Sequence, residues 1–406
     1  MKASKKTLIV LLTVLMLLTG CSVGSGNNGK QNSDVITRTK YGHSIVDFLY
    51  KEGGGNIIIS NVSINMALAM LLEGANGDTQ KQLEEYLGYS KEEARNICRE
   101  LLDSLKENID KQKKTWSDGT EYDTGLGFVE IANSLWFRKE AIIKEEYQKL
   151  LEKYFDATAQ SLDFMDPKST DIINGWVSDK TKGLINEILK PDILPGLYML
   201  LINALYMKGS WTEGYNARTE GMFNGEKADV LKSIENLYYE NSKATAFGKL
   251  INGGYEMIAI LPKKTGEFTL TELDIEGLLK SESQAYDVIT SIPAFELDSF
   301  VNLSDVLKAL GVKDAFDPTR SDLSGIRDIV GENRLFVSDV LHKTHVKIDE
   351  KGFEGAAVTA ILVKDTALPA QKQQKEVIID RPFVFMIIDR NTGTAIFTGK
   401  VVNLNK

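Results

Sequence analysis

One stretch near the C-terminus, residues 350–363, constrains the fold of this chain more than any other part. Its small residues lead into β-branched and aliphatic residues that favour a pleated strand, yet the polar residues that follow, 364–375, are typical of an exposed loop. A strand of this composition without a partner would be an aggregation hazard in water. The small residues from Gly352 to Ala360 suit insertion between two existing strands. This stretch is therefore a candidate for two structural states.

The segments that flank this stretch carry a long and specific pattern. Residues 342–357 read His-Lys-x-x-x-x-x-Asp-Glu-x-Gly-x-Glu-x-Ala-Ala. Arg-Pro-Phe-x-Phe follows at 381–385 and Thr-Gly-Lys-Val-Val-Asn at 398–403. On these motifs the chain resembles the serpin family. Further matches extend over nearly the whole chain from about residue 40, at residues 56–64, 67–70, 74–79, 174–185, 203–211 and 322–326.

The resemblance implies an α+β protein with the serpin fold. This fold is a single large domain with a central, mostly antiparallel sheet, further β-sheets, about eight or nine helices and an exposed reactive-centre loop, here at about 350–376. A length of 406 residues would also hold two or three average domains. Because no Pro- and Gly-rich linker occurs after residue 40, we expect one domain over residues 38–406, present as a monomer.

The N-terminus has the pattern of a processing signal. Lysines precede an apolar run, residues 8–18, that is too short for a comfortable membrane span, so residues 1–20 are predicted to be a signal peptide. Leu-Thr-Gly-Cys at 18–21 resembles the bacterial lipobox, which implies a lipidated Cys21 inserted into a lipid bilayer. Residues 21–37 then form a flexible polar linker.

This signal predicts an extracytoplasmic lipoprotein, at the cell surface or anchored to a membrane, that could also be released extracellularly. An ordinary secretory signal is the alternative. Removing residues 1–20 takes away three lysines and no acidic residue, so the formal charge changes from −9 to −12. An acidic domain has no attraction to phosphate backbones, so nucleic acid is not an expected partner. Cys98, the other cysteine, is predicted to be a buried thiol on an amphipathic helix.

The motifs of common enzyme classes are missing from the sequence. It has no Gly-x-Ser-x-Gly elbow, no His-Glu-x-x-His pair, no phosphate-binding loop and no Cys-x-x-Cys pair. His342 and His345 are three residues apart, which on a strand places them on opposite faces and argues against a ligand pair. We therefore expect no catalytic residue, no metal and no cofactor, and the resemblance implies a protease inhibitor.

The resemblance also gives roles to residues of the central sheet. The polar cluster beneath the middle of that sheet, called the shutter, is matched by Ser60, Ser63, Asn203 and His342. Buried polar groups need hydrogen-bond partners, and re-pairing them could set the barrier to opening the sheet. Trp211 matches the tryptophan at the top of the sheet, the breach, and is equally compatible with a plain core position.

In an inhibitory serpin the loop is bait for a serine protease, which is the implied partner. The protease attacks the scissile bond and forms an acyl-enzyme, and the cut loop then inserts into the main sheet as a new strand. At ~3.3 Å per residue, about 15 inserted residues carry the protease about 50 Å. The starting fold is kinetically trapped because it lacks this strand.

The part of the loop that enters first is the hinge. It is matched by Glu350, Gly352, Phe353, Glu354, Gly355, Ala356, Ala357, Val358, Thr359 and Ala360. By the family's register, the residues that point inward are Phe353, Gly355, Ala357 and Thr359. Phe353 departs from the family, which usually has threonine or serine there. Overpacking would cost ~1–3 kcal/mol and apolar burial would gain ~1.5–3 kcal/mol, so the net effect is open.

A second departure is Ala294, where many relatives carry a lysine that pairs with the residue at Glu350. Loss of an exposed pair costs only about 0–1 kcal/mol and does not decide function. The family's interval from Gly352 places the scissile bond at Thr366-Ala367. Thr366 suits an elastase-like or subtilisin-like protease, while Lys364 keeps a trypsin-like target open.

The leading function is therefore a suicide inhibitor of extracellular serine proteases. An inhibitor of trypsin-like or cysteine proteases is one alternative. Another is a non-inhibitory serpin that is cut as a substrate or acts as a binding protein, which Phe353 favours and the small-residue hinge opposes. An enzyme of unrelated class has no supporting motif.

Overall fold

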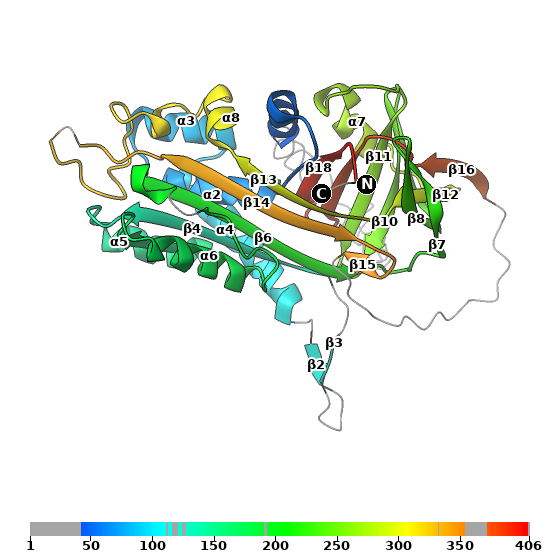
Figure 1. The fold of residues 1–406 in the computed structure, drawn as a ribbon, viewed down its shortest axis with the longest axis horizontal. Helices are drawn as coiled ribbons and strands as arrows, with labels where there is room; N and C mark the ends of the chain where they lie inside the picture. Colours follow the sequence, from blue (N-terminus) through cyan, green and yellow to red (C-terminus); the bar gives the residue numbers. More distant parts are fainter. Residues whose placement is uncertain are drawn as a thin grey trace, which may run out of the picture.

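The computed structural model describes residues 42–110, 113–115, 121–123, 127–190, 193–331, 333–353 and 372–404. Within this part of the chain, three sheets are the main feature, and most helices gather at one end of the molecule (Figure 1). The helix at residues 42–53 is followed by α2 (Asn61–Gly74), α3 (Gly77–Leu87), α4 (Lys91–Asp110), α5 (Glu145–Phe155), α6 (Lys168–Lys180), α7 (Ile275–Leu279) and α8 (Ser304–Ala309).

The front sheet has six strands in the order β13-β14-β15-β6-β4-β5. Their bounds are β13 Phe295–Asn302, β14 Asp339–Ile348, β15 Gly352–Phe353, β6 Met199–Ser210, β4 Phe128–Arg138 and β5 Thr158–Leu162. Most neighbours in this sheet pair antiparallel; β14 with β6 and β4 with β5 pair parallel. This agrees with the mostly antiparallel central sheet predicted from the sequence.

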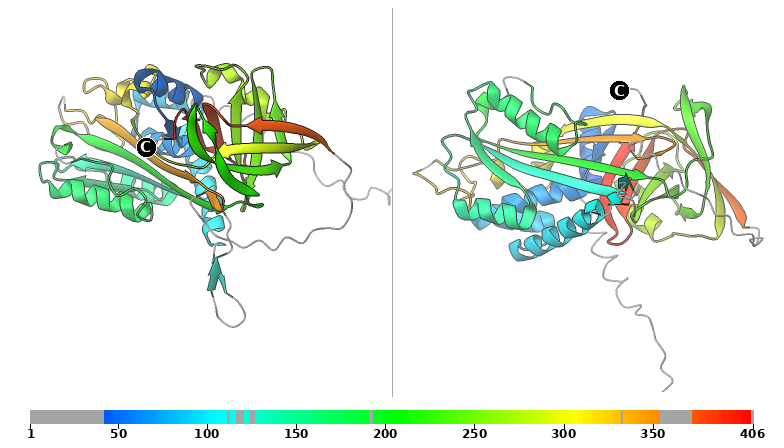
Figure 2. Two further views of the ribbon diagram at one scale, coloured as in Figure 1. Left: turned by 45° about the vertical axis from the view of Figure 1, so that its right-hand side comes forward. Right: turned by 90° about the horizontal axis from the view of Figure 1, so that it is seen from below.

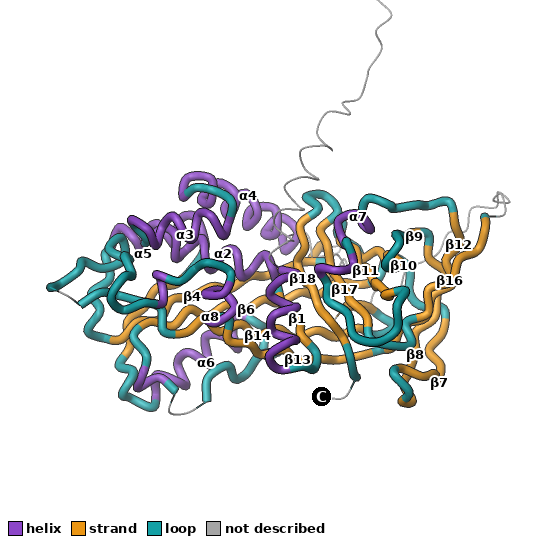
Figure 3. The backbone as a smooth tube through the Cα atoms, turned by 90° about the horizontal axis from the view of Figure 1, so that it is seen from above, coloured by secondary structure: helices purple, strands orange, loops and turns teal. Residues whose placement is uncertain are grey.

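Strand β6 is apolar along most of its length because helices cover both of its faces. Figure 2 shows α6 on one side of the front sheet and α2 and α4 on the other. Leu200 and Ile202 pack in the cluster that contains the α6 residue Val177, while Met199 and Leu201 pack in the cluster of α2. The same layering is visible from above, with strands between two sets of helices (Figure 3).

The second sheet contains β1 (Ile57–Ile59), β18 (Thr394–Val401), β17 (Phe383–Asp389), β11 (Tyr255–Pro262), β10 (Ala244–Ile251) and β9 (Leu237–Glu240). The third contains β16 (Gln373–Ile378), β12 (Tyr286–Pro293), β8 (Glu226–Glu235) and β7 (Ala217–Phe223). A short hairpin joins β2 (Lys113–Thr115) to β3 (Glu121–Asp123). None of the helices in the described ranges is long and apolar enough to cross a bilayer.

Candidate functional site

The front sheet is closed at one end and split at the other. Strands β14 and β6 run parallel and pair directly where residues 339–343 meet residues 200–204. Toward the C-terminal ends of both strands, β15 lies between them, and Phe353 pairs with Ile348 of β14 and with Gly209 of β6 (Figure 1). The opening in the sheet is thus already entered by the first two residues of a third strand.

A tight turn at residues 349–352 joins β14 to β15. The Asp349 carboxylate accepts hydrogen bonds from the backbone N–H groups of Lys351, at 2.8 Å, and Gly352, at 3.1 Å. The Asp349 N–H donates to the carbonyl of Gly352 at 3.2 Å. A Cβ atom on Gly352 would lie 2.3 Å from the carbonyl oxygen of Gly209, so only glycine fits at this close approach of two strands.

Phe353 points inward, in the direction expected from the register. Its side chain is 1% exposed and its ring lies 5.8 Å from the ring of Phe397 in β18, measured between centroids. The residue that departs from the family is therefore accommodated between the front and second sheets. Burial of its ring favours the entered position of β15.

Trp211 lies directly after β6 and holds the turn from one side. Its Nε1–H donates to the carbonyl oxygen of Asp349 at 2.8 Å, and its ring packs edge-to-face on Tyr215 with centroids 5.6 Å apart. Trp211 also forms a β-bridge with Ile251 of β10. It is both a core residue, 3% exposed, and a direct contact of the turn at residues 349–352.

Glu350 has a partner that the sequence does not predict. Arg218 of β7 donates to the Glu350 carboxylate at 2.9 Å and to Asp229 of β8 at 2.6 Å. The pair with Glu350 is exposed on both sides, so its contribution to stability is about 0–1 kcal/mol. The lysine absent at Ala294, between β12 and β13, is thus replaced by an arginine of β7.

The shutter residues meet where the front sheet is closed. His342 and Asn203 are cross-strand neighbours and both are fully buried. The backbone N–H of Ser60 donates to Nε2 of His342 at 3.0 Å, so Nδ1 carries the proton and donates to Oδ1 of Asn203. Asn203 in turn donates to Asn133 of β4. Burial lowers the pKa of His342 to about 3, which keeps the ring neutral at physiological pH.

The serines of the cluster shape the start of α2. The hydroxyl oxygen of Ser60 accepts from the N–H of Ser63 at 3.3 Å and so caps the helix. Asn61, where the family usually has proline, is buried and donates to the Thr398 hydroxyl at 3.1 Å. Two further residues adjoin the cluster: Asn133 accepts a hydrogen bond from Asn203, and Thr344 donates to the carbonyl of Ile58 at 2.9 Å. Neither carries a local sequence signal that would have indicated this.

Several predicted residues lie outside the described part of the chain. These are Cys21, Glu354, Gly355, Ala356, Ala357, Val358, Thr359, Ala360, Thr366 and Ala367. The chain is described again from Lys372, and β16 begins at Gln373 and pairs parallel with β12. The prediction of an exposed loop up to residue 375 was therefore wrong at its end, because residues 373–375 form a sheet edge.

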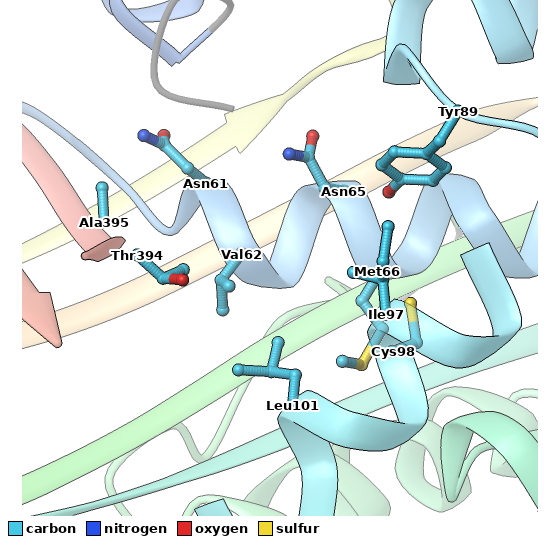
Figure 4. A pocket seen from close by; sticks show the side chains of 10 residues that line it. All are labelled: Asn61, Val62, Asn65, Met66, Tyr89, Ile97, Cys98, Leu101, Thr394 and Ala395. Carbon is cyan, nitrogen blue, oxygen red and sulfur yellow. The ribbon is translucent and has the colours of Figure 1, made fainter. Parts of the chain in front are cut away.

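The helical end of the molecule holds a small cavity between α2, α4 and the start of β18 (Figure 4). Its volume is about 30 Å³, which is room for about one water molecule. Cys98 lines it and is 3% exposed, so the predicted burial of this thiol is confirmed. Within the described ranges, no three His, Cys, Asp or Glu side chains gather in a way that would hold a metal ion.

The chain is similar in sequence to proteins of one known family. A family profile described as "Serpin (serine protease inhibitor)" matches residues 37–404. The chain is 29% identical to human serpin B11 over 383 residues, covering 86% of this chain and 94% of that protein. It is 30% identical over 441 residues to an uncharacterized serpin-like protein of Thermococcus kodakarensis, covering 97% and 98% of the two chains.

Solved structures give the same result for the fold. Native tengpin, a thermophilic serpin, superposes with a TM-score of 0.76 at 28% identity and covers 95% of this chain and 96% of its own. Arabidopsis AtSerpin1 in its native stressed conformation superposes with a TM-score of 0.78 and covers 92% and 98%. At 24% identity, this second likeness concerns the fold alone.

Proposed function

The chain belongs to the serpin family, whose profile covers residues 37–404, and on this premise we propose that it is a suicide inhibitor of extracellular serine proteases. The family and the fold predicted from the sequence are confirmed by that match and by the likeness to tengpin. Members of this family are generally inhibitors of serine proteases and are not enzymes, although some do not inhibit.

We base the inhibitory mechanism on strand β15. Its residue Phe353 already pairs with Ile348 on one side and Gly209 on the other. If the chain continued antiparallel from there, Thr359 would lie opposite His342 of β14 and opposite Asn203 of β6. These two residues pair with each other in the closed part of the sheet. Both neighbours thus offer the same register, and the loop can enter without a slip of either strand.

The alternation of side chains supports the same mechanism. Because Phe353 points inward, Gly355, Ala357 and Thr359 would follow on the same face, and all three are small. From Phe353 to Thr366 the arm spans about 45 Å at ~3.3 Å per residue. Strand β6, with 12 residues, provides a groove edge of comparable length. The new strand would gain hydrogen bonds on both sides, so the starting state is kinetically trapped.

The non-inhibitory alternative draws its main support from Phe353, which is larger than the family's usual residue. That support is weakened because the ring is already buried between the sheets with the β15 backbone paired on both sides. The expected target follows from Thr366, whose side chain suits the small or medium pocket of an elastase-like or subtilisin-like protease. The lipobox at Cys21 adds the proposal that the inhibitor acts outside the cytoplasm, tethered by lipid.

The test is complex formation with a panel of serine proteases. Elastase-like or subtilisin-like enzymes are expected to form an SDS-stable covalent complex with the mature protein. Mass spectrometry should show that the released fragment begins at Ala367. A protease with a blocked active-site serine is the control and should give no complex. Stoichiometric cleavage of the loop by every protease, with no complex from any, would refute the inhibitory function.

A further inference from the structure

We propose that the ion pair of Lys249 with Glu235 forms a buried strut. This strut couples the two ends of the reactive loop and positions Trp211 against the turn at residues 349–352. This inference rests on the proposed inhibitory function and names residues that regulate it. Glu235 lies on β8 of the third sheet, Lys249 lies on β10 of the second sheet, and Trp211 directly follows β6 of the front sheet.

The Glu235 end of the strut is tied to the strand that follows the loop. Ser233 and Glu235 lie on β8, and the Ser233 hydroxyl donates to the Glu235 carboxylate at 2.5 Å. The same hydroxyl lies 2.9 Å from the hydroxyl of Thr290 on β12. Thr290 is the register partner of Val377 on β16. The carboxylate is thus fixed relative to the C-terminal end of the loop.

The Lys249 end lies inside the molecule among aromatic rings. The Nζ atom donates to Glu235 at 2.5 Å, and the side chain is 1% exposed. Nζ also lies 4.2 Å from the ring centroid of Tyr215 and 5.7 Å from that of Trp211. A desolvated cation beside aromatic rings is attracted to them. The ammonium group therefore connects Glu235 to both rings.

The path ends at the turn that starts the inserted strand. Trp211 donates to the carbonyl of Asp349, and the Asp349 carboxylate accepts the N–H groups of Lys351 and Gly352. If the Trp211 indole shifts, the turn at residues 349–352 loses the hydrogen bond from Trp211 to the Asp349 carbonyl. Contacts at hydrogen-bonding or cation–ring distance therefore run without a break from Thr290 to Asp349.

A buried ion pair is a weak contributor to stability, because desolvation offsets much of the attraction between its charges. Two apolar residues of similar size would hold the sheets together about as well. A charged pair at this place is better explained by the position that it imposes on Trp211. Loosening the contact of Trp211 with this turn would let Phe353 leave the sheet. The pairing of β15 with β14 and β6 would then have to re-form before the loop inserts. Slower insertion gives the acyl-enzyme more time to hydrolyse.

The test uses the full mature chain with Lys249→Met and with the double variant Lys249→Met/Glu235→Leu, which replaces the pair by apolar side chains. Hydrogen exchange at residues 351–353 is expected to become about tenfold faster in both. The number of inhibitor molecules consumed per trapped protease should rise at least about twofold. Lys227→Met, which removes the exposed pair of Lys227 with Glu220 on the same sheet, is the control and should change neither.

The double variant separates positioning from stability. If it keeps the parent's exchange protection at residues 351–353, or the parent's stoichiometry, the strut is only structural and the inference is overturned. If the parent chain traps no protease, the proposed function fails, and the exchange measurement still decides whether Lys249 positions the hinge.

Discussion

Phe353 and Phe397 pack against each other with ring centroids 5.8 Å apart, so the inward-pointing residue of β15 also contacts the second sheet. Threonine or serine, the family's usual choice at this position, could not make that contact. Phe353 is therefore not a misfit at this position, because its packing on Phe397 holds β15 in the sheet.

Replacing Phe353 by aspartate is expected to expel β15 from the sheet, because a buried carboxylate would have no partner there. After loop cleavage, the melting temperature of the parent should rise strongly and that of the variant should not. Calorimetry of the cleaved proteins measures this. Phe300→Asp, at an exposed position of β13 in the same sheet, is the control. An equal rise in both variants would show that Phe353 does not lead the insertion.

Replacing Thr359 by arginine tests the register, since this residue is expected to enter beside His342 and Asn203. The charged side chain should block insertion at the shutter, so the variant would be cut without trapping the protease. Val358→Arg is the matched control, because its side chain would face outward and the complex should persist. Gel analysis of both reactions decides, and the opposite pattern would mean that the register is shifted by one residue.

Replacing Thr366 by arginine should move inhibition toward trypsin-like proteases, because the side chain before the scissile bond fills the specificity pocket of the protease. The length of the inserting arm is unchanged, so trapping should remain efficient. The ratio of association rate constants for trypsin-like and elastase-like enzymes should change by at least about tenfold, which corresponds to about 1.4 kcal/mol. Unchanged rates would place the scissile bond elsewhere.

Acid should destabilise the native protein partly through His342. Burial lowers its pKa from 6.5 to about 3, so between these values the unfolded chain binds more protons than the native one. The stabilising term is complete above pH 6.5 and is lost as the pH falls toward 3. At pH 4.5 the loss amounts to roughly 3 kcal/mol.

In denaturant titrations at pH 4.5 and 7.5, His342→Gln should remove about half of the acid dependence that the two buried histidines, His342 and His43, cause together. His345→Gln, on the opposite face of β14, should keep it. Part of the dependence will remain in any variant that retains His43, because burial lowers the pKa of that ring to about 4. A slope that is identical in the parent and in His342→Gln would contradict a neutral buried imidazole.

The family motifs predicted the fold, and the structure places Ser60, Asn203 and His342 in one hydrogen-bonded group. Contacts between sheets were not predictable in the same way. Lys249 lies in a strand, Ala-Thr-Ala-Phe-Gly-Lys-Leu-Ile, whose pattern suggests an exposed lysine and a buried leucine. The structure has the reverse, with Lys249 buried and Leu250 exposed. A charged residue can be buried when it pairs with an opposite charge on another strand, as Lys249 does with Glu235. The local sequence pattern of one strand does not reveal such a partner.

The direct pairing of β14 with β6 has a consequence for the direction of the conformational change. It is a parallel ladder of five residue pairs within an otherwise mostly antiparallel sheet. Parallel ladders are slightly less stable per residue than antiparallel ones. An entering strand would remove this parallel contact and create two antiparallel contacts, as β15 has begun to do. The strand directions alone therefore favour the sheet that contains the inserted strand. A return to the closed sheet would replace antiparallel hydrogen bonding by a slightly less stable parallel ladder.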